Sequence, residues 1–163
     1  MEAFTGKVWV LGDDIDTDII IPTEYLAMKT IDDMKQYAFS PLRPELAGQI
    51  QKGDIIVAGK NFGCGSSREQ APEIIKALGI QCVIAKSFAR IFFRNAINNG
   101  LLLIEQPNLY DDIKEGDTIT VHMNKHVDYN SKEYPIAALP ENLMRIIQAG
   151  GLVGAMRKLN GLD

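Results

Sequence analysis

Cysteine and histidine are scarce in this sequence, which has two residues of each among 163. Two thiols, Cys64 and Cys82, are too few to hold an iron–sulfur cluster or an all-cysteine zinc site. A chain of this length can bury a hydrophobic core without disulfides or a structural metal. We therefore expect a reduced, cytoplasmic protein that carries no metal or cofactor of its own.

An excess of positive charge is also lacking, since 17 Lys and Arg face 21 Asp and Glu, for a net charge of −4. Nonspecific nucleic-acid binding needs a basic surface, so no such partner is expected. No apolar run approaches the roughly 18 residues of a membrane span, and residues 1–7 lack the apolar core of a signal peptide. A small anionic substrate remains open, because it needs only local positive charge.

Short apolar runs alternate with helix-length segments along the chain. Strands are predicted at 7–11, 54–58, 82–85, 101–104 and 118–123, with one or two more within 127–137. Helices are predicted at 31–39, from a cap at Ser66 or Ser67 to residue 78, from a cap at Ser87 to about residue 98, from Pro140 onward, and again at 152–159. The pattern indicates an α/β or α+β fold in one domain spanning residues 1–163.

Residues 59–69 form the most informative stretch, where a strand leads into a glycine-rich loop and then a helix start. Free N–H groups and the positive end of the helix dipole favour an anion there, and Gly63 and Gly65 permit close approach. The hydroxyls of Ser66 and Ser67 with the guanidinium of Arg68 can hold a carboxylate. The alternative that these residues leave open is a purely structural turn and cap.

Two common phosphate-binding motifs do not fit this loop. A Walker A motif would need glycine at Asp54, five residues before Gly59, and Ser or Thr at Asn61. A dinucleotide fingerprint would need glycine at Arg68, three residues after Gly65. The loop is therefore predicted to bind anions in another way.

A serine in this loop could act as a base if its alkoxide were stabilised. A cation about 4 Å away at an effective dielectric of about 20 contributes roughly 4 kcal/mol, or about three pKa units. The hydroxyl pKa of serine lies far above neutrality, so Arg68 alone is insufficient. The helix dipole, backbone N–H donors and a nearby metal would have to add to it.

Three strings of residues carry a family resemblance. Gly-Cys-Gly-Ser-Ser-Arg-Glu at 63–69, Lys-Ser-Phe-Ala-Arg-Ile at 86–91 with Asn95, and Asp-Ile-Asp-Thr-Asp at 14–18 resemble the swivel domain of the aconitase superfamily. The resemblance covers nearly the whole chain at the expected spacing. It implies a single-domain α/β protein with the β/β/α swivel-type fold of an aconitase C-terminal domain. As a free-standing chain, it is similar to the small subunit of the family's two-subunit hydro-lyases.

The resemblance also implies roles for individual residues. Ser66 matches the catalytic base, with Arg68 and Asp18 as further catalytic residues and Ser67 and Gly65 as substrate-binding residues. The implied partner is a large subunit whose [4Fe–4S] cluster binds the substrate's hydroxyl and a carboxylate. The implied reaction dehydrates a small hydroxy dicarboxylate to an alkene diacid and rehydrates it at the neighbouring carbon.

A second segment of the resemblance, Tyr25, Leu26, Ala27 and Met28, concerns substrate choice. Relatives that handle citrate or homocitrate place an arginine in this loop, where this chain has Ala27. An apolar loop suits an apolar substituent, such as an isopropyl group or the two methyls of a dimethylmalate. The alternative is that Leu26 and Met28 simply pack into the core.

His122 and His126 are predicted not to bind metal, because they flank a strand-like stretch and Met123 replaces the glutamate of HExxH. The aspartates at 14, 16 and 18 lack the glycine and distal glutamate of an EF-hand, so a polar turn is predicted. Cys64 is expected to be a buried, inert thiol.

Two further alternatives stay open. Arg90 and Arg94 could be surface charges or could help to dock a partner. A different functional class, a non-catalytic module that only binds anions through residues 63–68, also fits the loop.

Overall fold

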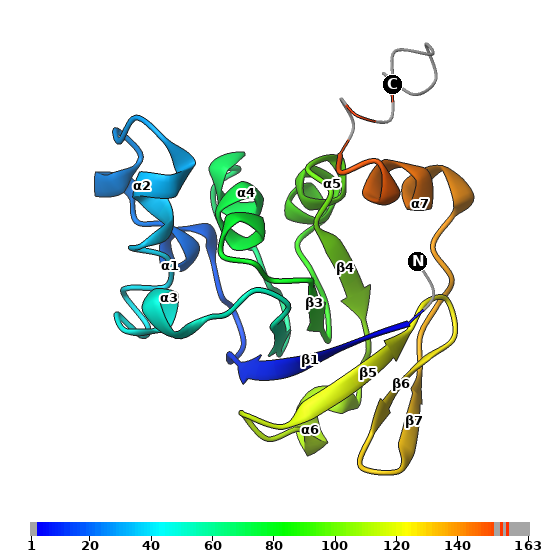
Figure 1. Cartoon of the computed structure of the whole chain (residues 1–163). Helices are drawn as coiled ribbons and strands as arrows, with labels where there is room; N and C mark the ends of the chain where they lie inside the picture. Colours follow the sequence, from blue (N-terminus) through cyan, green and yellow to red (C-terminus); the bar gives the residue numbers. More distant parts are fainter. Residues whose placement is uncertain (1–2, 152–153, 155, 157–163) are drawn as a thin grey trace.

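The computed structural model describes residues 3–151, 154 and 156 and contains one seven-stranded sheet in the order β4-β3-β2-β1-β5-β6-β7 (Figure 1). Strands β1 to β4 are parallel to one another, and β5, β6 and β7 extend the sheet from β1 as an antiparallel half. The strands are β1 (Ala3–Val10), β2 (Ile55–Ala58), β3 (Cys82–Ala85), β4 (Leu102–Glu105), β5 (Thr118–His122), β6 (His126–Tyr129) and β7 (Lys132–Pro135).

The parallel strands β2 and β3 are apolar on both faces. Every residue of β2 and β3 is buried, as expected for parallel strands that are covered on both sides. Their bounds agree with the predicted strands at 54–58 and 82–85. Strands β6 and β7 fill the 127–137 stretch as a hairpin.

The helices lie between and after the strands, and those up to residue 98 cover one face of the parallel half. In chain order they are α1 (Thr17–Ile20), the 3-10 helix η1 (Thr23–Tyr25), α2 (Ile31–Lys35), α3 (Leu46–Gln49), α4 (Gln70–Ala77), α5 (Arg90–Asn98), α6 (Leu109–Asp112) and α7 (Glu141–Gln148). Helices α4 and α5 stand side by side, each between two parallel strands in sequence (Figure 1). No helix within residues 3–151 is long and apolar enough to cross a membrane.

Two clusters of buried side chains fill the two faces of the sheet. One cluster joins alternate residues of the parallel strands, such as Ile56 and Val83, to helices α1 to α5. The other joins the opposite faces of the same strands, such as Val57 and Ile84, to residues of the antiparallel half, such as Val121. Because both halves of the sheet share the second cluster, the sheet curls over itself. The layers are therefore β/β/α, as the family resemblance implies.

Two predicted helix caps are wrong. Helix α4 begins at Gln70 with Glu69 at its cap position, so Ser66 and Ser67 lie in the preceding loop. The loop persists to Glu69 because Gly63 and Gly65 adopt positive φ and the Ser66 carbonyl accepts a hydrogen bond from elsewhere. Helix α5 starts after Ala89, and the Ser87 hydroxyl instead accepts a hydrogen bond from the Asn61 N–H at 2.8 Å.

Other predicted bounds also differ from the structure. Helix α2 ends at Lys35, because the chain turns through Phe39 at a φ of 61°. The predicted helix at 152–159 falls mostly outside the described residues.

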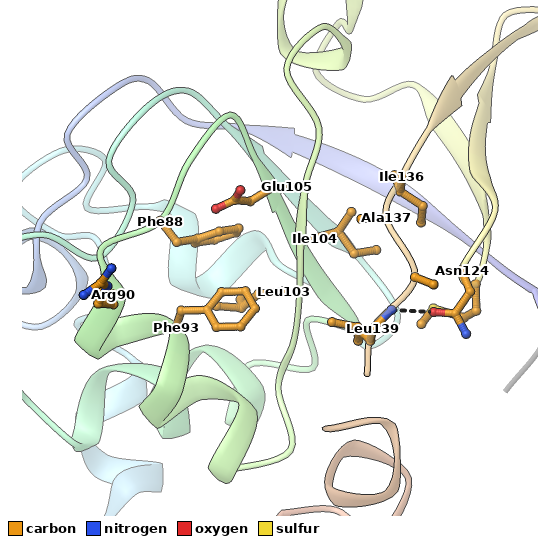
Figure 2. Close-up of a pocket in the computed structure, with 12 residues that line it drawn as sticks. Phe88, Arg90, Phe93, Leu103, Ile104, Glu105, Asn124, Ile136, Ala137 and Leu139 are labelled. Carbon is orange, nitrogen blue, oxygen red and sulfur yellow. Dashed lines mark hydrogen bonds between the residues drawn. The ribbon is translucent and has the colours of Figure 1, made fainter. Parts of the chain in front are cut away.

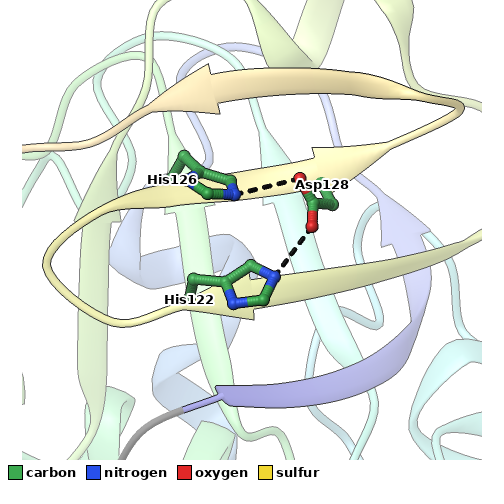
Figure 3. A group of neighbouring side chains, drawn as sticks. All are labelled: His122, His126 and Asp128. Atoms are coloured by element: carbon green, nitrogen blue, oxygen red, sulfur yellow. Dashed lines mark hydrogen bonds and ion pairs between the residues drawn. The ribbon is translucent and has the colours of Figure 1, made fainter.

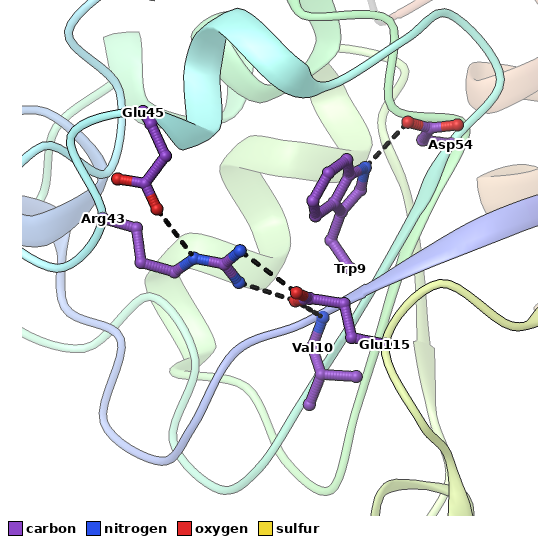
Figure 4. Close-up of polar contacts among 6 residues, drawn as sticks. All are labelled: Trp9, Val10, Arg43, Glu45, Asp54 and Glu115. Atoms are coloured by element: carbon purple, nitrogen blue, oxygen red, sulfur yellow. Dashed lines mark hydrogen bonds and ion pairs between the residues drawn. The ribbon is translucent and has the colours of Figure 1, made fainter.

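Polar contacts fasten the segment before β2 to strand β1 (Figure 4). The Arg43 guanidinium donates to both Glu115 carboxylate oxygens at 2.6 and 3.1 Å, and Glu115 also accepts from the Val10 N–H at 3.0 Å. The buried Asp54 accepts from the Trp9 indole at 2.7 Å. The hydrogen bond from Arg43 lowers the pKa of Glu115. These contacts hold the 36–50 segment, and with it the turns around α1, against the sheet.

Candidate active site

A pocket of about 200 Å³ lies where the glycine-rich loop meets the start of α5. Its walls come from loop residues 63 and 65–68, from Thr17, and from α5 residues up to Asn95. The predicted site residues Gly65, Ser66, Ser67 and Arg68 therefore share one cavity.

Glycine at position 63 allows the loop to approach α5. Gly63 has a φ of 83°, and a β-carbon added there would lie 2.2 Å from the Phe92 ring. Any side chain would therefore push the loop away from the helix that forms the other wall of the pocket. Gly65 also has a positive φ, of 93°, but a β-carbon there would meet only ordinary contacts.

Hydrogen bonds connect the 14–18 segment to the glycine-rich loop. The Ile15 carbonyl accepts from the Gly63 N–H at 2.7 Å, and the Thr17 N–H donates to the Cys64 carbonyl at 2.9 Å. The Thr17 hydroxyl, which is buried, donates to the Ser66 carbonyl at 2.8 Å. Thr17 is thus a positioning residue for Ser66.

The aspartates that precede Thr17 form a polar turn, as predicted. Asp13 accepts from the Lys60 N–H at 2.7 Å, and Asp14 accepts from the Asn61 side chain at 3.2 Å. Asp16 caps α1 by accepting from the Ile19 N–H at 2.8 Å. These carboxylates hold backbone and side-chain N–H groups of their own chain.

Ser66 and Ser67 are both exposed, so their hydroxyls are open to a ligand. They face a pocket whose other wall includes the first turn of α5, where Ala89 caps the helix without a side-chain hydrogen bond. The first N–H groups of a helix have no partner inside it, and its dipole favours negative charge at that end. The pocket therefore suits a carboxylate.

The Arg68 guanidinium, which was predicted to bind a substrate carboxylate, already has partners within the chain. The side chain is only 14% exposed and is already engaged, donating to the Ile21 carbonyl at 2.7 Å and the Thr23 hydroxyl at 2.8 Å. It also forms an ion pair with Asp18, whose side chain is 65% exposed. The structure thus brings Asp18 and Arg68 together. The Asp18 carboxylate pairs with the guanidinium that was predicted to bind a substrate carboxylate.

The 25–28 segment lies outside this pocket. Tyr25 stacks on Tyr37 with ring centroids 4.1 Å apart, and Leu26 and Met28 are half-buried against the main core. Ala27 is exposed. None of these four residues lines the 200 Å³ pocket. The packing interpretation of Leu26 and Met28 agrees with the structure, and Ala27 is left as the residue that could reach a ligand.

Cys64 is half-buried rather than fully buried. Burial raises the pKa of its thiol, and the carboxylates of Asp16 and Asp14 raise it further. A raised pKa keeps the thiol protonated and weakly nucleophilic, in agreement with the predicted inert role.

Sequence reasoning missed Thr17 and the first turn of α5 as parts of the site. Both belong to strings that the family resemblance had marked, 14–18 and 86–91, so the signal was present without a stated role. Arg90 is exposed and lines the pocket, whereas Arg94 is exposed farther along the helix.

A second, larger pocket of about 400 Å³ adjoins the first through Arg90 (Figure 2). Its walls are mainly apolar and include Phe88, Phe93 and Ile136. Leu139, on the far wall, donates its N–H to the Asn124 side chain at 3.0 Å. No local pattern could reveal this pocket, because its walls come from segments far apart in the sequence.

Comparisons with known proteins identify the family of the chain. The aconitase C-terminal domain family matches residues 15–109. The chain is 78% identical over 162 residues to a 3-isopropylmalate dehydratase small subunit from Lachnospira eligens, covering 99% of each chain. It is 52% identical to the small subunit from Heliobacterium modesticaldum, covering 92% of each chain.

A solved structure shows the same fold. The crystal structure of a 3-isopropylmalate dehydratase from Methanocaldococcus jannaschii superposes with a TM-score of 0.92 at 40% identity, covering 98% of this chain and 96% of that one. The chain therefore belongs to the aconitase C-terminal domain family and, within it, to the 3-isopropylmalate dehydratase small subunits.

Proposed function

We propose that this chain acts with a large subunit as a hydro-lyase that interconverts 2-isopropylmalate and 3-isopropylmalate, a step of leucine biosynthesis. The observation that carries the proposal is the pocket that gathers Ser66, Ser67 and Arg68 at the first turn of α5. The near-complete match to small subunits of the same enzyme supports it.

The chemistry assigned to this chain is proton transfer at carbon. Dehydration breaks the C–H bond next to a carboxylate and the C–O bond of the adjacent carbon, leaving an alkene diacid, a proton and a hydroxide. We assign the proton to the Ser66 oxygen and the hydroxide to the large subunit. Rehydration adds that proton to the carbon that lost the hydroxide and adds hydroxide to the carbon that lost the proton, so the isomerisation is balanced.

Several groups must act together to make Ser66 basic. A guanidinium close to the alkoxide gives roughly three pKa units, and a helix N-terminus in a partly buried setting adds up to about 2 kcal/mol, or about 1.5 units. Both groups line the same pocket. The remainder is assigned to backbone N–H donors of the loop and to a metal that the large subunit would bring, because exclusion of water strengthens these interactions but by itself disfavours a charged alkoxide.

The substrate carboxylate next to the carbon that loses its proton would lie against the Gly65 to Ser67 segment and the start of α5. The Arg68 guanidinium would then exchange Asp18 for this carboxylate or bind both through its five N–H donors. Asp18 is well placed for such an exchange, because it is exposed while Arg68 stays fixed by Ile21 and Thr23. Asp18 thus keeps the guanidinium aligned before the substrate arrives.

The thiols of this chain do not fit an iron–sulfur cluster. Cys82 is fully buried in β3, and Cys64 is the other cysteine of the sequence. We therefore assign a [4Fe–4S] cluster, which would activate the leaving hydroxyl, to the large subunit. The free state of both thiols supports a cytoplasmic location for the complex.

A mixing experiment tests the proposed function. The chain alone, a cluster-loaded 3-isopropylmalate dehydratase large subunit alone, and their mixture are assayed on 2-isopropylmalate, 2,3-dimethylmalate and homoaconitate. We expect turnover only in the mixture and fastest on 2-isopropylmalate. Faster turnover of dimethylmalate would reassign the substrate. If the mixture forms a complex but turns over none of the three, while the chain still binds dicarboxylates, the chain is an anion-binding module.

A further inference from the structure

The antiparallel half of the sheet gathers three metal-ligating side chains on one face (Figure 3). His122 ends β5 and is the direct cross-strand partner of His126, which begins β6. Asp128 follows His126 by two residues and so lies on the same face of the strand. One ligand atom from each residue lies within 4.8 Å of the other two.

Contacts within the cluster point all three polar ends toward one place. The Asp128 carboxylate uses one oxygen for each imidazole, with Nε2 of His122 at 2.7 Å and Nε2 of His126 at 3.1 Å. The imidazole rings lie 4.7 Å apart between centroids. The side chains are half-buried, with exposed fractions of 34% for His122, 24% for His126 and 43% for Asp128. They are open to an ion from solvent and still held by the sheet.

We propose that His122, His126 and Asp128 bind one divalent transition-metal ion of the Zn²⁺ class on the outer face of the β5–β6 hairpin. Two imidazoles and one carboxylate form a ligand set that suits Zn²⁺, Ni²⁺ and Cu²⁺ and does not suit Mg²⁺ or Ca²⁺. The site is separate from the proposed active site, because none of the three residues lines the pocket around Ser66.

The spacing of the three groups allows a tetrahedral ion after a small adjustment. Zn–N bonds of about 2.0–2.1 Å place two ligand atoms of a tetrahedron about 3.3–3.4 Å apart. The His–Asp separations of 2.7 and 3.1 Å must therefore lengthen by roughly 0.2 to 0.7 Å to reach that spacing, which side-chain rotation can supply. Each imidazole binds the ion through an Nε2 that carries no proton. Glu133, with Oε2 at 3.5 Å from His126 Nε2, or a water would complete the four ligands.

Sequence spacing predicted no metal here, because the HExxH pattern places two histidines on one face of a helix and this pair flanks a strand-like stretch. A hairpin achieves the same juxtaposition through strand register, since His122 and His126 pair directly across its turn. Asp128 then occupies the next position on that face. A four-residue spacing between histidines indicates a shared face of a hairpin only when the position of the turn between the strands is known.

The chain offers a clean test because His122 and His126 are its two histidines. Imidazole ring nitrogens are followed by long-range ¹H–¹⁵N NMR of the full-length chain while Zn²⁺ is added, and affinity is measured by calorimetry. We expect saturation at one ion per chain and a shift of the Nε2 signal of both rings. Excess Mg²⁺ should not displace the ion.

Matched variants locate the site. His126→Gln and Asp128→Asn should each raise the Zn²⁺ dissociation constant at least tenfold. Cys64→Ser, which removes the other soft ligand near the surface, should leave the constant unchanged. Unshifted imidazole signals in the unaltered chain at saturating Zn²⁺ would overturn the proposal even if a variant failed to fold. Binding that survives both hairpin variants and disappears in Cys64→Ser would overturn it as well.

Discussion

Replacing Thr17 by valine should show whether Thr17 supports turnover by positioning Ser66 or only by stabilising the fold. The Thr17 side chain is 2% exposed, and its hydroxyl donates to the Ser66 carbonyl at 2.8 Å. Valine has the same shape and lacks only the donor. The lost hydrogen bond lowers the free energy of unfolding by about 1 kcal/mol, the usual net contribution of one hydrogen bond.

The effect on turnover should be larger than the effect on stability. Without the anchor, the loop can shift by about 1 Å, a displacement that can reduce catalysis by about 10²-fold. We therefore expect kcat of Thr17→Val to fall about 10- to 100-fold, with a smaller change in KM. The Thr17 backbone contact to Cys64 is retained, so the loop stays folded.

Thr17→Ser is the matched control. It keeps the hydroxyl and removes one buried methyl, which lowers the free energy of unfolding by a similar amount, about 1 kcal/mol. Both variants are measured by urea unfolding and by steady-state kinetics after reconstitution with the large subunit. We expect similar stability losses and a kcat of Thr17→Ser within about threefold of the unaltered chain. Equal losses of kcat in the two variants would refute the positioning role.

Three further predictions concern other parts of the chain. Arg68→Lys should lower kcat/KM by at least about 10²-fold, because one ammonium cannot replace the guanidinium's contacts. An unchanged kcat/KM would show that Arg68 is not part of the site. Ala27→Arg should shift the ratio of kcat/KM toward homoaconitate over 3-isopropylmalate; an unchanged ratio would show that the exposed Ala27 does not face substrate. Glu115→Gln should reduce stability by about 0.5–1 kcal/mol at pH 7, a screened value for this partly exposed pair. Because the folded-state pKa of Glu115 is lowered, the difference should vanish as pH falls from 4.5 through that pKa, and urea unfolding from pH 7 to 3 checks this.

Strands were the most predictable part of the fold. The runs 54–58 and 82–85 are apolar throughout, and burial on both faces of a parallel sheet requires that pattern. Helix starts were less predictable, because Ser66, Ser67 and Ser87 look like caps in isolation. Hydrogen bonds from Thr17 and Asn61 instead hold Ser66 and Ser87 in loops, and no local sequence pattern reveals such long-range contacts.

The candidate site was predictable in part as a set of residues and not as a geometry. The loop string 63–69 identified Ser66, Ser67 and Arg68 through the family resemblance. The engagement of Arg68 by Ile21 and Asp18 depends on how α1 packs beside the loop. The pairing of His122 with His126 depends in the same way on hairpin register. Both are long-range arrangements that residue spacing alone does not determine.

The most direct test of the central claim is the turnover number of Ser66→Ala in the reconstituted complex. We expect kcat for 2-isopropylmalate to fall about 10³-fold, the usual loss on removing a general base. Binding to the large subunit and folding should be unchanged, as should the kcat of Ser131→Ala in the exposed β6–β7 turn. A kcat of Ser66→Ala close to that of Ser131→Ala would contradict the assignment of proton transfer to this chain.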